Sequence, residues 1–231
     1  MQRVAAITGG FGTLGRAVGA AFAADGWKVA LLDRASAPDA SALDEQDTQW
    51  RLGGVDLTDL GSARTAMSSI VERFGSLNAL INVAGGFRWE TLADSDLDAW
   101  DLMYQMNVRT AATASRAALD LIGAAPQGGR IVNIGAGAAL RAGAGMGAYA
   151  ASKAGVLRLT EALADELKDQ GITVNAILPG IIDTPQNRKD MPDADFSRWV
   201  QPADIAAVIL FLASQAASAV TGALIPVTGR L

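Results

Sequence analysis

Thr8-Gly9-Gly10-Phe11-Gly12-Thr13-Leu14-Gly15 follows a short apolar run, Val4 to Ile7, and leads into a segment whose apolar residues recur at helical spacing. Gly10, Gly12 and Gly15 form a G-x-G-x-x-G pattern between an expected strand and an expected helix. One such glycine permits a tight turn, one lets a pyrophosphate approach the backbone, and one lets the helix lie close to the strand. The free N–H groups of the helix N-terminus also favour phosphate. The stretch therefore predicts dinucleotide contacts from Gly9, Gly10, Phe11, Gly12, Thr13, Leu14 and Gly15.

An acidic residue ends the next expected strand, Val29-Ala-Leu-Leu-Asp33. A carboxylate there can accept hydrogen bonds from ribose hydroxyls and would repel a 2′-phosphate. No Lys or Arg lies inside the glycine loop, so NAD(H) is favoured as cofactor. NADP(H) stays possible, because the neighbouring Arg34 could accept a 2′-phosphate. The alternative is that the glycines are ordinary turn residues and Asp33 only ends a strand.

Short apolar runs alternate with longer segments of helical period along the rest of the chain. This alternation is typical of βαβ units. It predicts a single α/β domain over residues 1–231, a Rossmann fold with a doubly wound, mostly parallel sheet of about seven strands and helices on both faces. The expected strands are 3–8, 28–33, 50–55, 78–83, 130–134, 172–178 and 223–227. The expected helices are 13–24, 59–74, 96–122, 147–169 and 202–213. Residues 183–202 form the longest irregular segment, which we expect to be a surface loop or substrate lid.

The composition excludes several kinds of chemistry. The chain has no cysteine and no histidine, which removes thiolate nucleophiles, disulfides and His-dependent hydrolysis or zinc catalysis, and no metal site is expected. A net charge of −5 without a long basic run argues against nucleic acid and anionic membranes as partners. We see no secretory signal and no membrane-spanning stretch. A cytoplasmic protein with a small-molecule substrate is expected.

Tyr149-Ala-Ala-Ser-Lys153 lies near the start of an expected amphipathic helix. Tyr149 and Lys153 are four residues apart and share a helix face. An ammonium close to a phenol would lower the pKa of Tyr149 towards neutrality and make it a usable proton donor. Taken alone, the pattern also fits a half-buried tyrosine next to a solvated lysine, and its surroundings decide between the two interpretations.

Those surroundings resemble the short-chain dehydrogenase/reductase family over essentially the whole chain. The shared landmarks, in order, are the glycine loop 8–15, Asp56 in Val55-Asp-Leu-Thr58, Asn82-Val-Ala-Gly85, Asn107, Tyr149 with Lys153, Pro179-Gly180 and Thr184. The resemblance implies that Asp56 approaches the adenine ring and that Asn107 holds a water in a proton relay to Lys153. Taken singly, Asp56 could also end a strand and Asn107 could cap a bend. Cofactor contacts are implied for Asp56, Leu57, Asn82, Ala84, Gly85, Lys153, Pro179, Gly180, Ile182 and Thr184.

Two positions depart from the general family pattern. Thr13 stands where the family usually has glycine, and Ala136 stands where it usually has a serine that donates to a substrate carbonyl. Losing such a donor typically costs about 10²–10³ in rate. Both departures resemble the dihydropteridine reductase branch, as do Val83-Ala-Gly-Gly-Phe87 and the loop 183–199. Asn107 instead matches the relay residue of the general family, which we do not associate with that branch, and the segment 150–178 resembles a bacterial ketoreductase.

The resemblance implies a hydride transfer with Tyr149 as the proton donor, with a quinonoid dihydropteridine as the best specific candidate for the substrate. Phe87 or Trp89 could stack on such a ring, and Trp199 could belong to the lid or anchor it to the body. The alternatives are a reductase of 3-oxoacyl thioesters or small ketones, and a non-catalytic NAD-binding regulator. By resemblance, the Ala-rich helices 105–122 and 149–169 form a four-helix bundle across a two-fold axis, so a homodimer or homotetramer is expected.

Overall fold

The strands build one sheet. The structure, a computed structural model, describes residues 2–37, 48–95, 97–125 and 128–230. Within these ranges seven strands pair in the order β3-β2-β1-β4-β5-β6-β7, and every neighbouring pair is parallel. The strands are β1 (Val4–Thr8), β2 (Lys28–Leu32), β3 (Gln49–Leu52), β4 (Ala79–Asn82), β5 (Arg130–Ile134), β6 (Thr173–Pro179) and β7 (Leu224–Val227). The predicted seven-stranded parallel sheet is confirmed.

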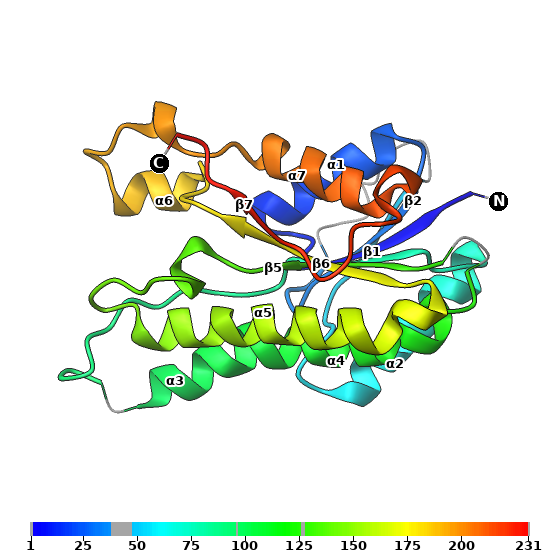
Figure 1. The fold of residues 1–231 in the computed structure, drawn as a ribbon, viewed down its shortest axis with the longest axis horizontal. Helices are drawn as coiled ribbons and strands as arrows, with labels where there is room; N and C mark the ends of the chain where they lie inside the picture. The colour runs from blue at the N-terminus through cyan, green and yellow to red at the C-terminus, as the bar shows by residue number, and fades with distance from the viewer. Residues whose placement is uncertain (1, 38–47, 96, 126–127, 231) are drawn as a thin grey trace.

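Helices cover both faces of the sheet (Figure 1). The α-helices are α1 (Thr13–Ala24), α2 (Leu60–Phe74), α3 (Asp98–Met103), α4 (Thr110–Ile122), α5 (Gly147–Leu167), α6 (Pro185–Asp190) and α7 (Pro202–Ala213). α1 and α7 lie on one face, and α2, α4 and α5 lie on the other. Among the described residues, none of these helices is long and apolar enough to cross a membrane.

The central strands are buried because helices cover them from both sides. Every residue of β1, β4 and β5 is buried, which is typical of parallel strands in doubly wound sheets. Two apolar clusters divide the core between the faces. One contains Phe22, Ile7 and Ile209, below α1 and α7. The other contains Met67 and Leu163, below α2 and α5.

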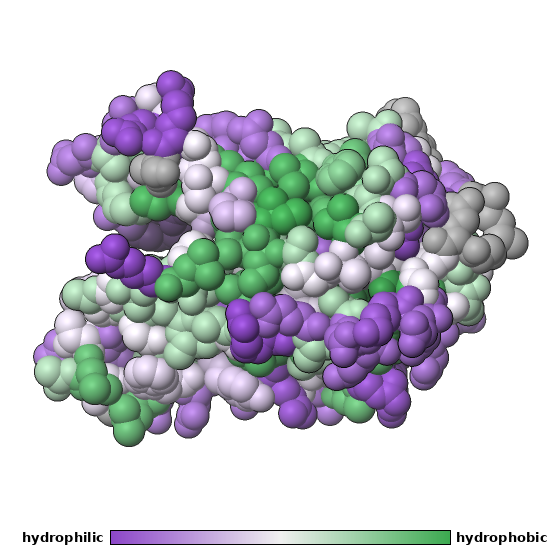
Figure 2. Space-filling model, in the orientation of Figure 1, coloured by the Kyte–Doolittle hydropathy of each residue, from purple (hydrophilic) through white to green (hydrophobic). Residues whose placement is uncertain are grey.

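The strand order places the functional edge. The chain runs outward from β1 through β2 to β3, then returns to the other side of β1 with β4. Ligands of open α/β sheets bind beyond the carboxyl ends of the strands at such a reversal. The glycine loop follows β1 directly and therefore lies at this point. In Figure 2 the surface is hollowed at this edge, between α6 and the segment that follows β5.

The helix expected over 96–122 is interrupted. Residue 96 lies outside the described residues, α3 begins at Asp98, and a π-helical segment from Tyr104 to Arg109 separates α3 from α4. A π segment carries one extra residue per turn and often occurs at functional sites. It includes Asn107, whose side chain is bound to the backbone of Gly86. One inserted residue is too small a change for the apolar periodicity of the sequence to reveal.

The expectation of irregular structure over 183–202 is wrong for part of that segment. α6 occupies Pro185–Asp190, and a short 3-10 helix occupies Phe196–Arg198. Thr184 caps α6 by accepting a hydrogen bond from the Asn187 N–H, and proline occupies the first helical position. Both are ordinary helix-start signals. β3 also ends earlier than expected, at Leu52, because Gly54 turns the chain with a φ of 73°.

Candidate active site

The glycine loop packs against β2 and the segment that follows β4, and each glycine has a different neighbour. Gly9 has a φ of 62°, and a Cβ there would lie 2.9 Å from the backbone of Ala84. A Cβ on Gly10 would lie 2.7 Å from Leu31, and one on Gly15 would lie 2.2 Å from the Gly9 carbonyl oxygen. The left-handed turn therefore belongs to Gly9, one residue before the G-x-G-x-x-G pattern to which the sequence assigned it.

Gly12 leaves room for a phosphate. A Cβ on Gly12 would have its nearest neighbour, the Gly9 carbonyl oxygen, 3.4 Å away. The residue is also exposed. It is the N-cap of α1 and offers no side-chain cap, so N–H groups of the first turn have no intrahelical acceptor. Thr13 and Leu14 open this turn. The loop thus fits a dinucleotide pyrophosphate, which accepts hydrogen bonds and is attracted by the helix dipole.

Two carboxylates lie beside the loop. Asp33 accepts hydrogen bonds from the N–H groups of Phe11 at 3.0 Å and Ala35 at 3.1 Å, so it joins the glycine loop to the end of β2. Asp56 accepts from the N–H and hydroxyl of Thr58 at 2.8 and 2.7 Å, and these bonds lower the pKa of Asp56. Leu57 is 5% exposed and belongs to the core, so only its backbone can face a cofactor.

The last residue of β4 belongs to the core, and the residues that follow it lie beside the glycine loop. The Asn82 side chain is buried and donates to Ser115 Oγ at 3.1 Å and Asn133 Oδ1 at 2.8 Å. The Asn82 side chain therefore points into the core, and a cofactor contact from this residue would have to come from its backbone. The Ala84 N–H donates to Thr8 Oγ1 at 3.1 Å. This bond holds the segment beside the glycine loop.

Tyr149 and Lys153 share a face of α5, and burial sets the pKa of each. Burial raises the pKa of Tyr149 to about 12 and lowers the pKa of Lys153 to about 8. Lys153 Nζ donates to the Ile134 carbonyl at 2.8 Å. The expected depression of the Tyr149 pKa by Lys153 is therefore not found. Loss of hydration outweighs charge attraction, since both groups leave water.

Asn107 binds the backbone of Gly86 from both sides. Its Oδ1 accepts the Gly86 N–H at 3.0 Å, and its Nδ2 donates to the Gly86 carbonyl at 3.1 Å. Gly85, just before, is held so closely that a Cβ there would lie 2.5 Å from Asn107 Oδ1 and 3.3 Å from Lys153 Nζ. The structure thus brings Asn107, Gly85 and Lys153 close together.

Ala136 lies at the carboxyl end of β5 with an extended backbone and is 6% exposed. Its neighbours Gly135, Gly137 and Ala138 carry no hydroxyl either. The side chains next to this position therefore include no donor that could share a substrate oxygen with Tyr149.

The three candidate substrate residues lie in different environments. Phe87 is 57% exposed and meets Tyr149 edge to face, with 4.9 Å between ring centroids. Trp89 is also exposed and donates from Nε1 to the Ala144 carbonyl at 3.0 Å. Trp199 is 4% exposed and packs on Phe196 at 4.7 Å. Of the two roles open for Trp199, its burial agrees with the anchor and leaves little surface for a substrate.

The segment after β6 is bound to the body. Pro179 ends β6, and the Gly180 N–H donates to the Val227 carbonyl at 3.2 Å. Ile182 pairs with Val200 in an isolated bridge, and its carbonyl accepts from Asn187 Nδ2 at 2.7 Å. The Thr184 hydroxyl oxygen accepts a hydrogen bond from the Asn187 N–H and so caps α6. These residues lie at the carboxyl edge, where a nicotinamide would be held.

Sequence reasoning missed two groups that complete this site. Ser152 is buried and bonded to both Asn107 and Tyr149, and Thr8 fixes Ala84. Both stood within quoted motifs, as the fourth residue of Tyr-Ala-Ala-Ser-Lys and the first of the glycine loop. Their hydroxyls gave no periodic or spacing signal, because each acts through one tertiary hydrogen bond.

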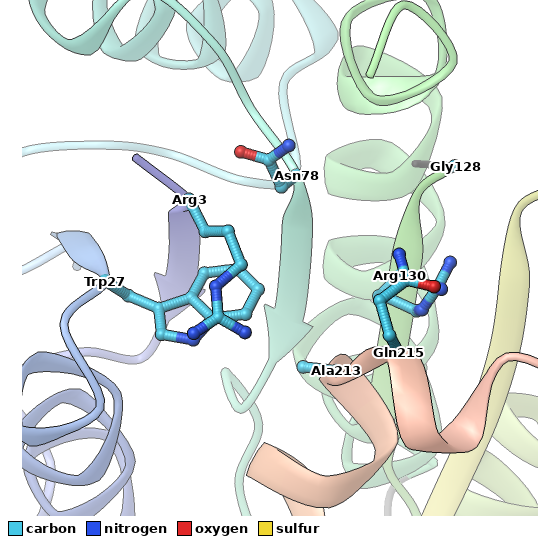
Figure 3. Close-up of a pocket in the computed structure, with 7 residues that line it drawn as sticks. All are labelled: Arg3, Trp27, Asn78, Gly128, Arg130, Ala213 and Gln215. Carbon is cyan, nitrogen blue, oxygen red and sulfur yellow. The ribbon is translucent and has the colours of Figure 1, made fainter. Parts of the chain in front are cut away.

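A small cavity lies at the opposite edge of the sheet. Figure 3 shows the Arg3 guanidinium over the Trp27 ring, with Asn78 and Arg130 on neighbouring strands. The cavity has a volume of about 20 Å³, which holds little more than one water. It lies where the strands begin, away from the glycine loop, and does not belong to the candidate active site.

A dinucleotide cradle next to a protonated phenol is the arrangement of an oxidoreductase that moves a hydride and a proton together. The family described as short chain dehydrogenase matches residues 3–195, and the chain belongs to this family. It is 34% identical to 2-(S)-hydroxypropyl-CoM dehydrogenase 3 of Xanthobacter autotrophicus, covering 100% of this chain and 96% of the relative. It is 32% identical to acetoacetyl-CoA reductase of Allochromatium vinosum, over 100% and 99%.

Solved structures agree with the fold. A short-chain type dehydrogenase/reductase from Mycobacterium ulcerans superposes with a TM-score of 0.90 at 28% identity, over 100% of this chain and 90% of that one. Carveol dehydrogenase of Mycobacterium avium in complex with NAD gives 0.84 at 26%, over 98% and 96%. ElxO with NADP bound gives 0.88 at 25%, over 99% and 98%. The protein is an NAD(P)-dependent oxidoreductase of the short-chain type, and these neighbours do not decide between the two cofactors.

Proposed function

We propose that this protein uses NADH to reduce a flat, conjugated, electron-poor ring, with a quinonoid dihydropteridine as the best specific candidate. The contact between Phe87 and Tyr149 carries the proposal. An exposed aromatic ring next to the proton donor offers a flat substrate a surface to stack on. With alanine at position 136, the site lacks the second donor that carbonyl reduction usually needs.

In this proposal the chain's residues hold the reactants and deliver one proton. The glycine loop binds the pyrophosphate, Asp33 the adenosine ribose and Lys153 the nicotinamide ribose. The reduced nicotinamide supplies the hydride when bound. Tyr149 Oη gives its proton to a ring nitrogen of the substrate, and solvent returns a proton to Tyr149. The ring gains a hydride and a proton, and NADH becomes NAD⁺.

The direct test follows NADH oxidation with quinonoid dihydropteridine beside a panel of ketones and 3-oxoacyl thioesters. The proposal expects kcat/KM for the dihydropteridine to exceed that of every carbonyl substrate. Turnover of carbonyl substrates alone would overturn the choice of substrate while leaving the Tyr149 chemistry in place.

The preference for NADH is proposed from Asp33. The carboxylate is fixed by two backbone N–H groups beside the loop, and a 2′-phosphate there would meet like charge. We expect Asp33→Asn to raise the NADPH/NADH ratio of kcat/KM on the order of tenfold to 100-fold, because like-charge repulsion is removed. Asp56→Asn is the matched control and should leave the ratio unchanged. An unchanged ratio in Asp33→Asn would place the discrimination elsewhere.

A keto reductase is the second candidate, and the relatives favour it. The chain is similar to acetoacetyl-CoA reductase over its full length. In that case Ala136 is a weakened carbonyl site, and Ala136→Ser should raise kcat for ketones by about 10²-fold or more by restoring a donor. Ala138→Ser places a hydroxyl two residues away and should have little effect. Flat or falling ketone rates in Ala136→Ser contradict the account of that position.

The two perturbed pKa values predict the pH dependence of reduction. Tyr149 keeps its proton throughout the neutral range, because its pKa is raised to about 12. Lys153 is charged below its pKa of about 8 and loses that charge above it. We therefore expect kcat/KM to be level below pH 8 and to fall above it, up to tenfold per pH unit. A profile that stays level to pH 10 contradicts a role for the Lys153 ammonium.

We also propose that the protein forms a homodimer or homotetramer. Apolar side chains gather on the surface over α7 and the edge strand β7 (Figure 2), and Phe211 on α7 is 48% exposed. On the opposite face, a groove of about 180 Å³ includes the small residues Ala148, Ala151 and Gly155. Small residues allow close helix packing between copies. Sedimentation equilibrium would decide the number of copies.

A further inference from the structure

Ser152 connects the two helical segments that carry the candidate catalytic groups. It is 5% exposed and lies on α5 between Tyr149 and Lys153. Its hydroxyl donates to the Tyr149 carbonyl at 2.7 Å. The same oxygen receives a hydrogen bond from Asn107 Nδ2 at 3.0 Å. Tyr149 and Asn107 are therefore joined through a single hydroxyl group.

The direction of these bonds fixes the Asn107 amide. A serine hydroxyl has one proton, and here it is committed to the Tyr149 carbonyl. Towards Asn107 the oxygen can only accept, so the NH₂ end of the amide must face Ser152. The oxygen end then faces the Gly86 N–H at 3.0 Å. A flipped amide would place oxygen against oxygen at Ser152 and N–H against N–H at Gly86.

The orientation of this amide determines what Lys153 faces. Asn107 Oδ1 and Lys153 Nζ both crowd the same point beside Gly85, at 2.5 and 3.3 Å from the Cβ that a larger residue would place there. The carbonyl oxygen, with its partial negative charge, thus lies on the side of the ammonium. An NH₂ group there would oppose the positive charge of Lys153.

We propose that Ser152 is a positioning residue, which acts together with the Gly86 backbone to hold the Asn107 amide in the orientation that presents its oxygen towards Lys153. This inference rests on the proposed roles of Tyr149 and Lys153. It does not require Ser152 to touch substrate or cofactor. Removing the hydroxyl would leave the amide held by the Gly86 backbone alone, which would weaken its hold on that orientation, lower the pKa of Lys153 further and loosen the Gly86 backbone before Phe87.

The test compares Ser152→Ala and Ser152→Thr by the pH dependence of NADH-driven reduction. Ser152→Ala should lower kcat about tenfold, the value of one ordinary hydrogen bond, and move the alkaline fall of kcat/KM to lower pH. Ser152→Thr keeps the hydroxyl, and the apolar groove beside it can take the added methyl group, so it should restore both. Ser69→Ala is the matched control, because Ser69 makes the same kind of backbone bond in α2, at 2.9 Å to Thr65, on an exposed face.

A double-mutant cycle separates positioning from a general loss of packing. If Ser152 acts through Asn107, adding Ser152→Ala to Asn107→Ala should change kcat little further. Fully additive losses, or a Ser152→Ala enzyme with the wild-type pH profile, overturn the inference. Tyr149→Phe serves as the separate arm: if that variant keeps full activity, the proposed function fails, whatever Ser152 does.

Discussion

Replacing Tyr149 with phenylalanine is expected to lower kcat for reduction by roughly 10²–10⁴-fold, the range for loss of a general acid. Ala136 stands where the family usually has a serine, so this position offers no hydroxyl that could donate a proton in place of Tyr149. The ring itself should stay in place, since it packs against Phe87 and the cluster around Met103. NADH affinity and melting temperature should therefore change little. Stopped-flow hydride transfer, NADH fluorescence titration and a thermal melt check the three expectations.

The chain provides its own control for this substitution. Tyr104 is the other tyrosine; it lies on the π-helical segment and is 51% exposed. Tyr104→Phe removes the same atom from the surface and should leave kcat unchanged. Equal rates in Tyr149→Phe and the wild type would remove Tyr149 from the chemistry and return the non-catalytic use of the fold to consideration.

Gly15→Ala is expected to damage both folding and cofactor binding. The new Cβ would lie 2.2 Å from the Gly9 carbonyl oxygen and 2.8 Å from Gly10 Cα. Both are backbone atoms of a loop that other contacts hold, so the start of α1 must move away. We expect the free energy of unfolding to fall by about 1–3 kcal/mol or more. NADH affinity should fall on the order of 100-fold, because the phosphate donors are misplaced by about 1 Å.

Gly143→Ala is the matched control for that overlap. Its Cβ would meet only Met146 Sδ, at 3.6 Å, which is ordinary contact. Denaturant unfolding and NADH titration of both variants give the comparison. A Gly15→Ala protein with wild-type NADH affinity would show that the helix N-terminus does not bind the pyrophosphate.

Two features of the site that the motifs did not reveal share one physical cause. Asn82 was expected among the cofactor contacts, and the structure shows that its amide completes a buried set of hydrogen bonds with Ser115 and Asn133. The pKa of Tyr149 was expected to fall and instead rises. In both cases burial decides, and burial depends on residues distant in the chain. Motif spacing contains no measure of how much water a side chain loses.

Local sequence patterns were enough to predict the parallel sheet, its seven strands and the place of the glycine loop. Those follow from local patterns, namely apolar runs of strand length, helical periodicity and glycines between them. Only the tertiary structure decided that Gly9 makes the left-handed turn, that Trp199 is buried and that Ser152 joins Asn107 to Tyr149. Close approach and hydrogen-bond direction arise between segments far apart in the chain. Such contacts are set when the strands and helices pack, and no local pattern encodes them.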